Sequence, residues 1–166
     1  WSSDVCSSDL IYYYNLNGDV KPFNNPKVRK ALAYSLDRQT IVDKITQGGQ
    51  LPAEGVVPVG LTDEKGGEYR DQVGDLVPYD VELAKTLFAE GLAEEGMTID
   101  EFNNAGFVIL YNTQEAHKKI AQAAQEMWRT ALGINIGVEN VEFQVKLDRE
   151  KAGDYQISRG GWIGDY

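Results

Sequence analysis

Residues 159–166 (RGGWIGDY) hold the pair of side chains in this sequence best suited to binding a charged ligand. Arg159 and Asp165 carry opposite charges six positions apart, and the intervening glycines suit a backbone that passes close to another group. A zwitterionic peptide would match both charges, because its amine pairs with a carboxylate and its carboxylate pairs with a guanidinium. Taken alone, the octapeptide fits better with a surface strand that carries two unrelated charges.

Three further positions offer chemistry, each with a simpler structural explanation. His117 is the single histidine and falls within an expected helix, where a histidine is more often a surface or structural group. Phe143 opens an expected short helix and fits either a core contact or a ligand contact. Glu139 or Glu142, paired with Asp165, raises a glycosidase hypothesis. With 26 acidic residues in the chain, such a pairing carries little weight.

Recognised catalytic motifs do not occur in the sequence. It contains no G-x-S-x-G, no H-E-x-x-H, no phosphate-binding loop and no G-x-G-x-x-G. One histidine and the single cysteine, Cys6, cannot build a transition-metal site of the usual kinds, so we expect no metal and no cofactor. The missing nucleophile favours a protein that holds its ligand without reacting, and therefore not an enzyme.

Residues 1–10 (WSSDVCSSDL) match, residue for residue, the translation of a common sequencing-adapter sequence. We therefore expect them not to be native and treat residues 11–166 as part of a longer protein. Without Asp4 and Asp9, the acidic residues still outnumber the 16 basic ones by eight. This balance argues against a nucleic-acid surface, which needs clustered Lys and Arg. The sequence has no apolar run long enough for a membrane span.

The hydrophobic pattern predicts one α/β unit with a mixed sheet flanked by helices. From residue 107 onward strands alternate with helices, which favours parallel pairing. Asn25 followed by Pro26 is typical of a helix start, and Asp37, Asp80 and Thr113 are expected to cap further helices. The expected strands cover residues 11–16, 107–111, 134–138 and 155–159. The expected helices begin after these caps and at residue 141, and residues 51–79 form a long irregular segment.

The order of many short motifs resembles the extracytoplasmic oligopeptide-binding proteins of ABC importers, solute-binding protein family 5. The matching segments cover essentially all of residues 11–166 and are residues 21–32, 37–38, 41–42, 47–53, 57–58, 111–113, 117–119, 128, 132–135, 147–148, 159–162 and 165–166. The His-Lys-Lys element at 117–119 occurs together with the arginine-to-tyrosine element at 159–166. This combination places the chain closer to the oligopeptide branch than to the dipeptide or nickel branches.

The resemblance implies an architecture of two lobes that close over an extended peptide. Residues 11–166 would correspond to much of the second lobe, so the first lobe is a missing partner of this chain. It further implies an oligopeptide ligand, an ABC importer permease as partner, and no nucleic acid. The implied location is the periplasm or, for a lipoprotein, the cell surface. A hydrolase acting on peptides or glycans and a signalling or chaperone variant of the same fold remain open alternatives.

The resemblance also implies roles for individual residues. Asp165 would pair with the α-amine of the peptide, while Arg159 and His117 would meet carboxylates of peptides of different length. Phe143 stands where the family often has tryptophan, so it would line a side-chain pocket without an indole donor. Trp162, inside the arginine-to-tyrosine element, completes the expected peptide-binding set. Backbone hydrogen bonds and hydrated pockets would give broad sequence tolerance.

Overall fold

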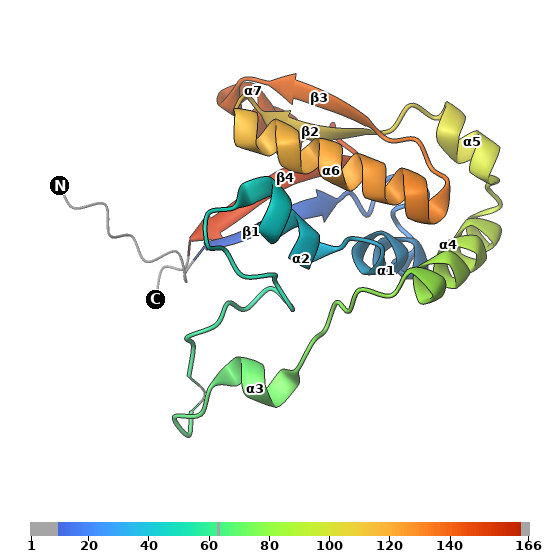
Figure 1. Ribbon diagram of the computed structural model, residues 1–166. Coiled ribbons are helices and arrows are strands. Elements are labelled where there is room, and N and C mark those ends of the chain that lie inside the picture. The colour runs from blue at the N-terminus through green and yellow to red at the C-terminus, as the bar shows by residue number, and fades with distance from the viewer. Residues whose placement is uncertain (1–9, 63, 164–166) are drawn as a thin grey trace.

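Four strands form one mixed sheet in the order β1-β4-β2-β3 (Figure 1). The computed structural model describes residues 10–62 and 64–163. The strands are β1 (Leu10–Leu16), β2 (Val108–Asn112), β3 (Gly137–Val141) and β4 (Ile157–Ile163). Strand β2 is parallel to both β3 and β4, whereas β1 is antiparallel to β4. The predicted mixed α/β sheet with parallel pairing after residue 107 is therefore confirmed.

Helices pack on this sheet and extend beyond one end of it. They are α1 (Pro26–Tyr34), α2 (Arg38–Thr40) with the π-helical turn η2 (Ile41–Thr46), α3 (Tyr69–Val73), α4 (Val81–Glu95), α5 (Ile99–Asn104), α6 (Glu115–Leu132) and α7 (Phe143–Ala152). In Figure 1, α6 crosses in front of the sheet. Helix α7 contacts β2, and its buried Lys146 shares Glu150 with Ser158 of β4. Ser158 alternates with the core residue Ile157, so α7 lies on the opposite face from α6.

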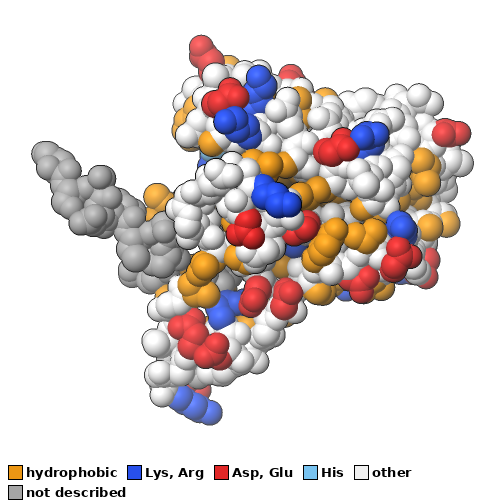
Figure 2. All heavy atoms as spheres, in the orientation of Figure 1, with side chains coloured by type: hydrophobic (Ala, Val, Ile, Leu, Met, Phe, Trp, Pro, Cys, Tyr) orange, Lys and Arg blue, Asp and Glu red, His pale blue; other side chains and the backbone are white. Residues whose placement is uncertain are grey.

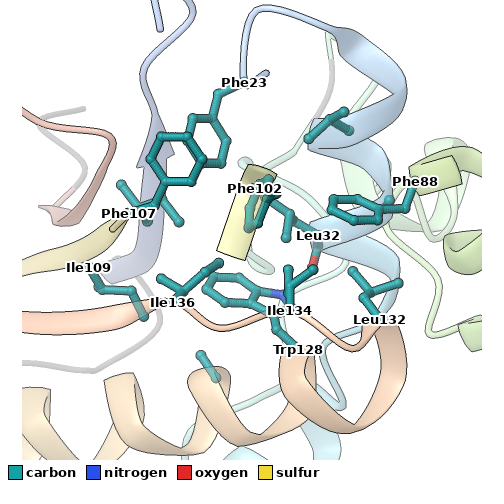
Figure 3. Packing of buried hydrophobic residues seen from close by; sticks show 14 of the residues in the cluster. Phe23, Leu32, Phe88, Phe102, Phe107, Ile109, Trp128, Leu132, Ile134 and Ile136 are labelled. Atoms are coloured by element: carbon teal, nitrogen blue, oxygen red, sulfur yellow. The ribbon is translucent and has the colours of Figure 1, made fainter. Parts of the chain in front are cut away.

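The main core lies on the α6 face and is rich in aromatic rings (Figure 3). Phe102 of α5 contacts three other phenylalanine rings edge-on, those of Phe23, Phe88 and Phe107. Trp128 of α6 is buried, and its indole Nε1 donates to the Leu32 carbonyl at 2.9 Å. Each such side chain contributes about 1.5–3 kcal/mol by leaving water. We call Phe23, Phe88, Phe102, Phe107 and Trp128 the aromatic core.

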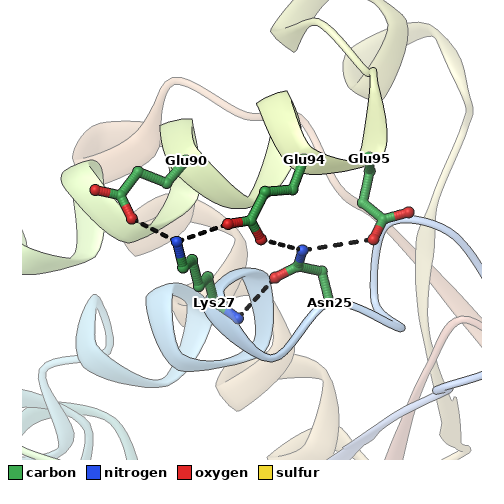
Figure 4. A network of polar contacts seen from close by, with 5 residues as sticks. All are labelled: Asn25, Lys27, Glu90, Glu94 and Glu95. Atoms are coloured by element: carbon green, nitrogen blue, oxygen red, sulfur yellow. Dashed lines mark hydrogen bonds and ion pairs between the residues drawn. The ribbon is translucent and has the colours of Figure 1, made fainter.

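Local signals for helix starts were read correctly in several places. Asn25 caps α1 by accepting from the Lys27 amide, with Pro26 at the first helical position. Asp37 and Asp80 cap α2 and α4 in the same way. The Asn25 amide and the Lys27 ammonium also reach α4, where they bind Glu94, and Lys27 binds Glu90 (Figure 4). This network joins the start of α1 to the last turns of α4.

Two helix boundaries differ from the prediction. Thr113 does not cap α6; the N-cap is Gln114 without a side-chain bond, and the Thr113 hydroxyl contacts the Asn140 side-chain oxygen instead. Helix α4 does not stop near Gly91 but continues to Glu95. Gly91 instead permits a close approach to α1. A Cβ at Gly91 would lie 2.7 Å from a Val28 methyl group. The packing of α4 against α1, and not the end of a helix, therefore requires this glycine.

Other elements were missed or shifted. Helix α5 was not predicted, although Thr98 and Glu101 form a full capping box at its start. The buried stripe of α6 includes Trp128 and Leu132, while the predicted Met127 and Ala131 are only half-buried. Strand β3 begins at Gly137, so the fully buried residues 134 and 136 precede it. Strand β1 is one residue longer than expected and begins at Leu10.

Residues 51–79 project from the body of the protein, as Figure 1 shows around α3. Arg70, only 6% exposed, donates to the Gly74 carbonyl and lies 3.7 Å from Glu54, which gives the segment internal order. In the same orientation, Figure 2 shows acidic side chains gathered on this projection.

Among the described residues, no helix has the length and apolar character needed to cross a membrane.

Candidate functional site

The carboxyl ends of the three parallel strands meet at one edge of the sheet. After β2 the chain enters α6, after β3 it enters α7, and β4 then returns to the other side of β2. In open α/β sheets, ligands bind outside such carboxyl ends, where the connections diverge to either side. His117 in the first turn of α6 and Arg159 in β4 lie at this divergence, as do Phe143 and Trp162 by their positions in α7 and β4.

His117 and Arg159 are joined by Tyr12 of β1. The Tyr12 hydroxyl lies 3.4 Å from His117 Nδ1, and the two rings are 5.6 Å apart between centroids. The guanidinium carbon of Arg159 lies 4.9 Å from the centre of the Tyr12 ring, within the range of a cation–π contact. Two residues predicted from the sequence to bind carboxylates are thus brought together by a third residue that was not predicted.

The electrostatics of this group are unusual. Burial, together with the positive charges of Arg159 and Lys146, lowers the pKa of His117 from 6.5 to about 4. The imidazole is therefore neutral near pH 7. Burial also raises the pKa of the Tyr12 hydroxyl, which keeps its proton. We call Tyr12, His117, Lys146 and Arg159 the carboxyl-edge cluster.

The Arg159 guanidinium lacks a counter-charge within residues 10–62 and 64–163. Its Nη1 lies 3.4 Å from the Asn112 side-chain oxygen, and its buried Nε has no hydrogen-bond partner there. A buried donor without a partner costs about 1–3 kcal/mol, more when it is charged. A bound carboxylate could accept from this group and remove that cost, so the arrangement suits an anionic ligand.

The two glycines after Arg159 are required by neighbours within the protein. A Cβ at Gly160 would collide with the Tyr13 ring on one face of the sheet. On the other face, a Cβ at Gly161 would lie 3.0 Å from Arg159 Nη2. The close approach suggested by the Gly-Gly step is therefore occupied by Tyr13 and by the Arg159 side chain itself.

Lys146 of α7 supplies a second cation near the edge. It is 3% exposed, and its ammonium pairs with Glu150 at 2.7 Å. The same carboxylate oxygen of Glu150 accepts from the Ser158 hydroxyl at 2.6 Å. Unlike Arg159, Lys146 is thus compensated by a carboxylate on its own helix.

The remaining predicted site residues are less constrained. Phe143 is 55% exposed and Trp162 is 59% exposed. They therefore offer apolar surface at the edge without forming a defined pocket. Asp165 lies outside the described residues.

Glu139 and Glu142, each a possible partner of Asp165 in the glycosidase hypothesis, lie in different surroundings. Glu139 forms an ion pair with Arg149 at 2.8 Å, and that arginine also binds Asp154. Glu142 precedes α7 as an exposed residue whose side chain makes no cap bond. Glu139 therefore has a structural partner. Within the described part of the chain, no group of three or more His, Cys, Asp or Glu side chains could hold a metal ion.

Sequence reasoning missed Tyr12, Asn112 and Lys146. Residues 12–14 were read only as a buried aromatic strand, yet their alternation contains the signal: Tyr12 and Tyr14 share a face with Arg159, while Tyr13 lies on the other. Asn112 could have been found as the residue that ends the central strand. Lys146 gave no signal, because a lysine in a short helix is usually solvated.

The chain belongs to a known family. The profile of the bacterial extracellular solute-binding proteins, family 5 middle region, matches residues 7–166. The chain is 43% identical over 159 residues to the oligopeptide-binding protein OppA of Bacillus subtilis, covering 94% of this chain and 28% of that protein. It is 37% identical to the periplasmic oligopeptide-binding protein OppA of Salmonella typhimurium, covering 93% of this chain and 27% of that protein.

Solved structures support the same fold. The chain superposes with a TM-score of 0.76 on Haemophilus influenzae OppA in complex with the peptide RPPGFSPFR, with 34% identity. That match covers 96% of this chain and 30% of the OppA chain. The chain therefore has the fold of a lobe of a periplasmic-binding protein and spans less than a third of the length of each relative named here.

Proposed function

We propose that the complete protein binds oligopeptides outside the cytoplasm and delivers them to the permease of an ABC importer. Residues 11–166 would form part of its second lobe, facing a first lobe that this chain lacks, and residues 1–10 would be translated adapter sequence. The observation that carries the proposal is the Arg159 guanidinium. It is half-buried beside a neutral histidine at the carboxyl edge of the sheet, in a chain of the family 5 solute-binding proteins.

The chemistry of the edge supports a peptide ligand. Arg159 and His117 would meet peptide carboxylates, and Asp165 would pair with the peptide amine. A buried ammonium and a buried carboxylate each need an opposite charge, because desolvation is otherwise prohibitive. The exposed rings of Phe143 and Trp162 would line side-chain pockets. Relatives named as oligopeptide-binding proteins, one of them solved with a nine-residue peptide, support this ligand class.

Location and the absence of turnover belong to the same proposal. Several relatives are named periplasmic proteins, which supports an extracytoplasmic location either free in the periplasm or as a lipoprotein. The family consists of solute-binding proteins, and we propose that this protein likewise does not transform its ligand. Peptide recovered after incubation should therefore be unchanged in mass, whereas a peptidase would release fragments.

Calorimetric titration of the full-length protein with peptides of increasing length tests the assignment. Asp165→Ala should weaken binding by about 2–5 kcal/mol, because it leaves the peptide ammonium without its counter-charge. Arg159→Ala and His117→Ala should have smaller effects that depend on peptide length. Acetylating the peptide amine should reproduce the Asp165→Ala loss in the wild type. If acetylation costs nothing, Asp165 does not hold the amine, and if no peptide binds, the proposed function is wrong.

A further inference from the structure

Tyr12 lies between the two groups that we assign to the peptide carboxylate. We propose that Tyr12 is a positioning residue: its hydroxyl donates to His117 Nδ1 and its ring holds the Arg159 guanidinium. Both groups then present donors toward one anionic ligand. The identity of that ligand rests on the proposed function, whereas the positioning itself is a property of the free protein.

The hydroxyl of Tyr12 selects one form of the His117 ring. A neutral imidazole has one N–H donor and one acceptor nitrogen. His117 is neutral near pH 7 and Tyr12 keeps its proton, since burial shifts the pKa of each group in that direction. In the proposed arrangement the Tyr12 hydroxyl, 3.4 Å from Nδ1, donates to this nitrogen, and Nε2 carries the hydrogen. His117 can thus donate to a carboxylate without being charged.

Keeping His117 neutral has a physical reason in its surroundings. The charged groups that act on it are Arg159 of β4 and Lys146 of α7, both positive, and its neighbour on β1 is the uncharged Tyr12. A protonated His117 would add a third positive charge to this half-buried group. A neutral donor held by Tyr12 avoids that repulsion while still offering an N–H.

The ring of Tyr12 restricts Arg159 through the register of the sheet. Tyr12 pairs directly with Gly161, and Arg159 lies two residues before Gly161 on the same face. The missing side chain at Gly161 leaves the space across from Tyr12 that the guanidinium occupies, 4.9 Å from the ring centre. Tyr12 and Gly161 together thus fix the position of the Arg159 guanidinium.

Histidine ¹⁵N NMR of the peptide-free, full-length protein reads the tautomer directly. The His117 signal is assigned by its loss in His117→Asn. We expect the Nε2–H form in the wild type and a shift toward Nδ1–H or a mixture in Tyr12→Phe, which keeps the ring over Arg159. Tyr13→Phe, on the other face of β1, is the matched control and should leave the tautomer unchanged.

Peptide titration of the same variants completes the test. Tyr12→Phe should weaken peptide binding about five- to tenfold, the scale of one hydrogen bond. Tyr12→Leu should weaken it more, because Arg159 also loses the aromatic ring that positions its guanidinium. A wild-type Nδ1–H form, or a Tyr12→Phe protein with unchanged tautomer and affinity, would overturn the positioning role. If the tautomer shifts as expected but the wild type binds no peptide, Tyr12 positions His117 and the proposed function fails.

Discussion

The aromatic core and the carboxyl-edge cluster lie against the same sheet but differ in whether their buried polar atoms have hydrogen-bond partners. In the core the one polar side-chain atom, Trp128 Nε1, is paired with the Leu32 carbonyl. In the cluster, Arg159 Nε is buried without a partner in the described part of the chain, and His117 has a pKa lowered to about 4. Aromatic rings contact each other in both regions, but in the cluster the Tyr12 ring also contacts a cation.

This difference separates residues whose polar atoms are paired within the fold from residues that we propose bind a ligand. A saturated core gains nothing from an added molecule, whereas a half-buried cation without a counter-charge gains from an anion. Substitutions in the core should therefore change folding stability first. Substitutions at the edge should change binding first, apart from the compensated ion pair of Lys146.

The largest effect is expected for Trp128→Ala. Removing this buried indole leaves a cavity and takes one donor from the Leu32 carbonyl, so the free energy of unfolding of the full-length protein should fall by about 3–5 kcal/mol. Denaturant titration measures the change. Trp162→Ala is the matched control, since its ring is 59% exposed and its removal should change stability by less than about 0.5 kcal/mol. Equal losses for both tryptophans would remove the distinction between core and edge.

The second largest effect is expected for Glu150→Ala, which should lower the free energy of unfolding by about 3 kcal/mol. It leaves the Lys146 ammonium buried without its partner, and breaking such a pair typically costs about 3–5 kcal/mol. The carboxylate is 21% exposed, which places the loss at the lower end. The double change Lys146→Met with Glu150→Leu should recover most of the stability. The exposed pair Lys85–Glu82 serves as comparison, and Glu82→Ala should cost less than about 1 kcal/mol. A Glu150→Ala loss no larger than that of Glu82→Ala would show that Lys146 is not a buried charge.

The lowered pKa of His117 predicts a specific pH dependence. His117 binds a proton less well in the folded state than in the unfolded state. Its contribution to the free energy of unfolding is therefore fully present above about pH 6.5 and is lost as the pH drops toward 4. This difference in pKa between the unfolded and folded states corresponds to up to about 3 kcal/mol in the free energy of unfolding. Other carboxylates titrate in the same range, so the unfolding free energy of His117→Asn is subtracted at each pH. A difference curve that is flat between pH 6.5 and 4 would contradict the burial of a neutral imidazole.

The smallest effect is expected at the start of α5. Thr98→Ala removes the side chain of a capping box and should cost about 1 kcal/mol, because the Glu101 amide loses its acceptor. The change reaches the aromatic core through Phe102 on the same helix. Thr86→Ala, at an exposed interior position of α4, should leave the midpoint of denaturation nearly unchanged. If Thr98→Ala has no larger effect than Thr86→Ala, α5 is held by Phe102 alone.

Local signals in the sequence determined the elements whose causes lie within a few residues. Asn25 with Pro26, Asp37 and Asp80 start their helices as expected, because an N-cap side chain bonds to amides two or three positions ahead. The alternation of apolar segments after residue 107 predicted the parallel strands. The order of the family motifs, including Arg159 and His117, identified the family that the profile match shows.

Only the tertiary structure decided what depends on residues far apart in the chain. Tyr12 joins His117 because β1 pairs with β4 in a register that sets Tyr12 opposite Gly161, and no local pattern encodes that register. Gly91, where the local sequence predicted a helix end, lies inside α4 and permits the close approach of α1. Caps and alternation act between near neighbours, whereas burial and charge compensation depend on which segments the folded sheet brings together.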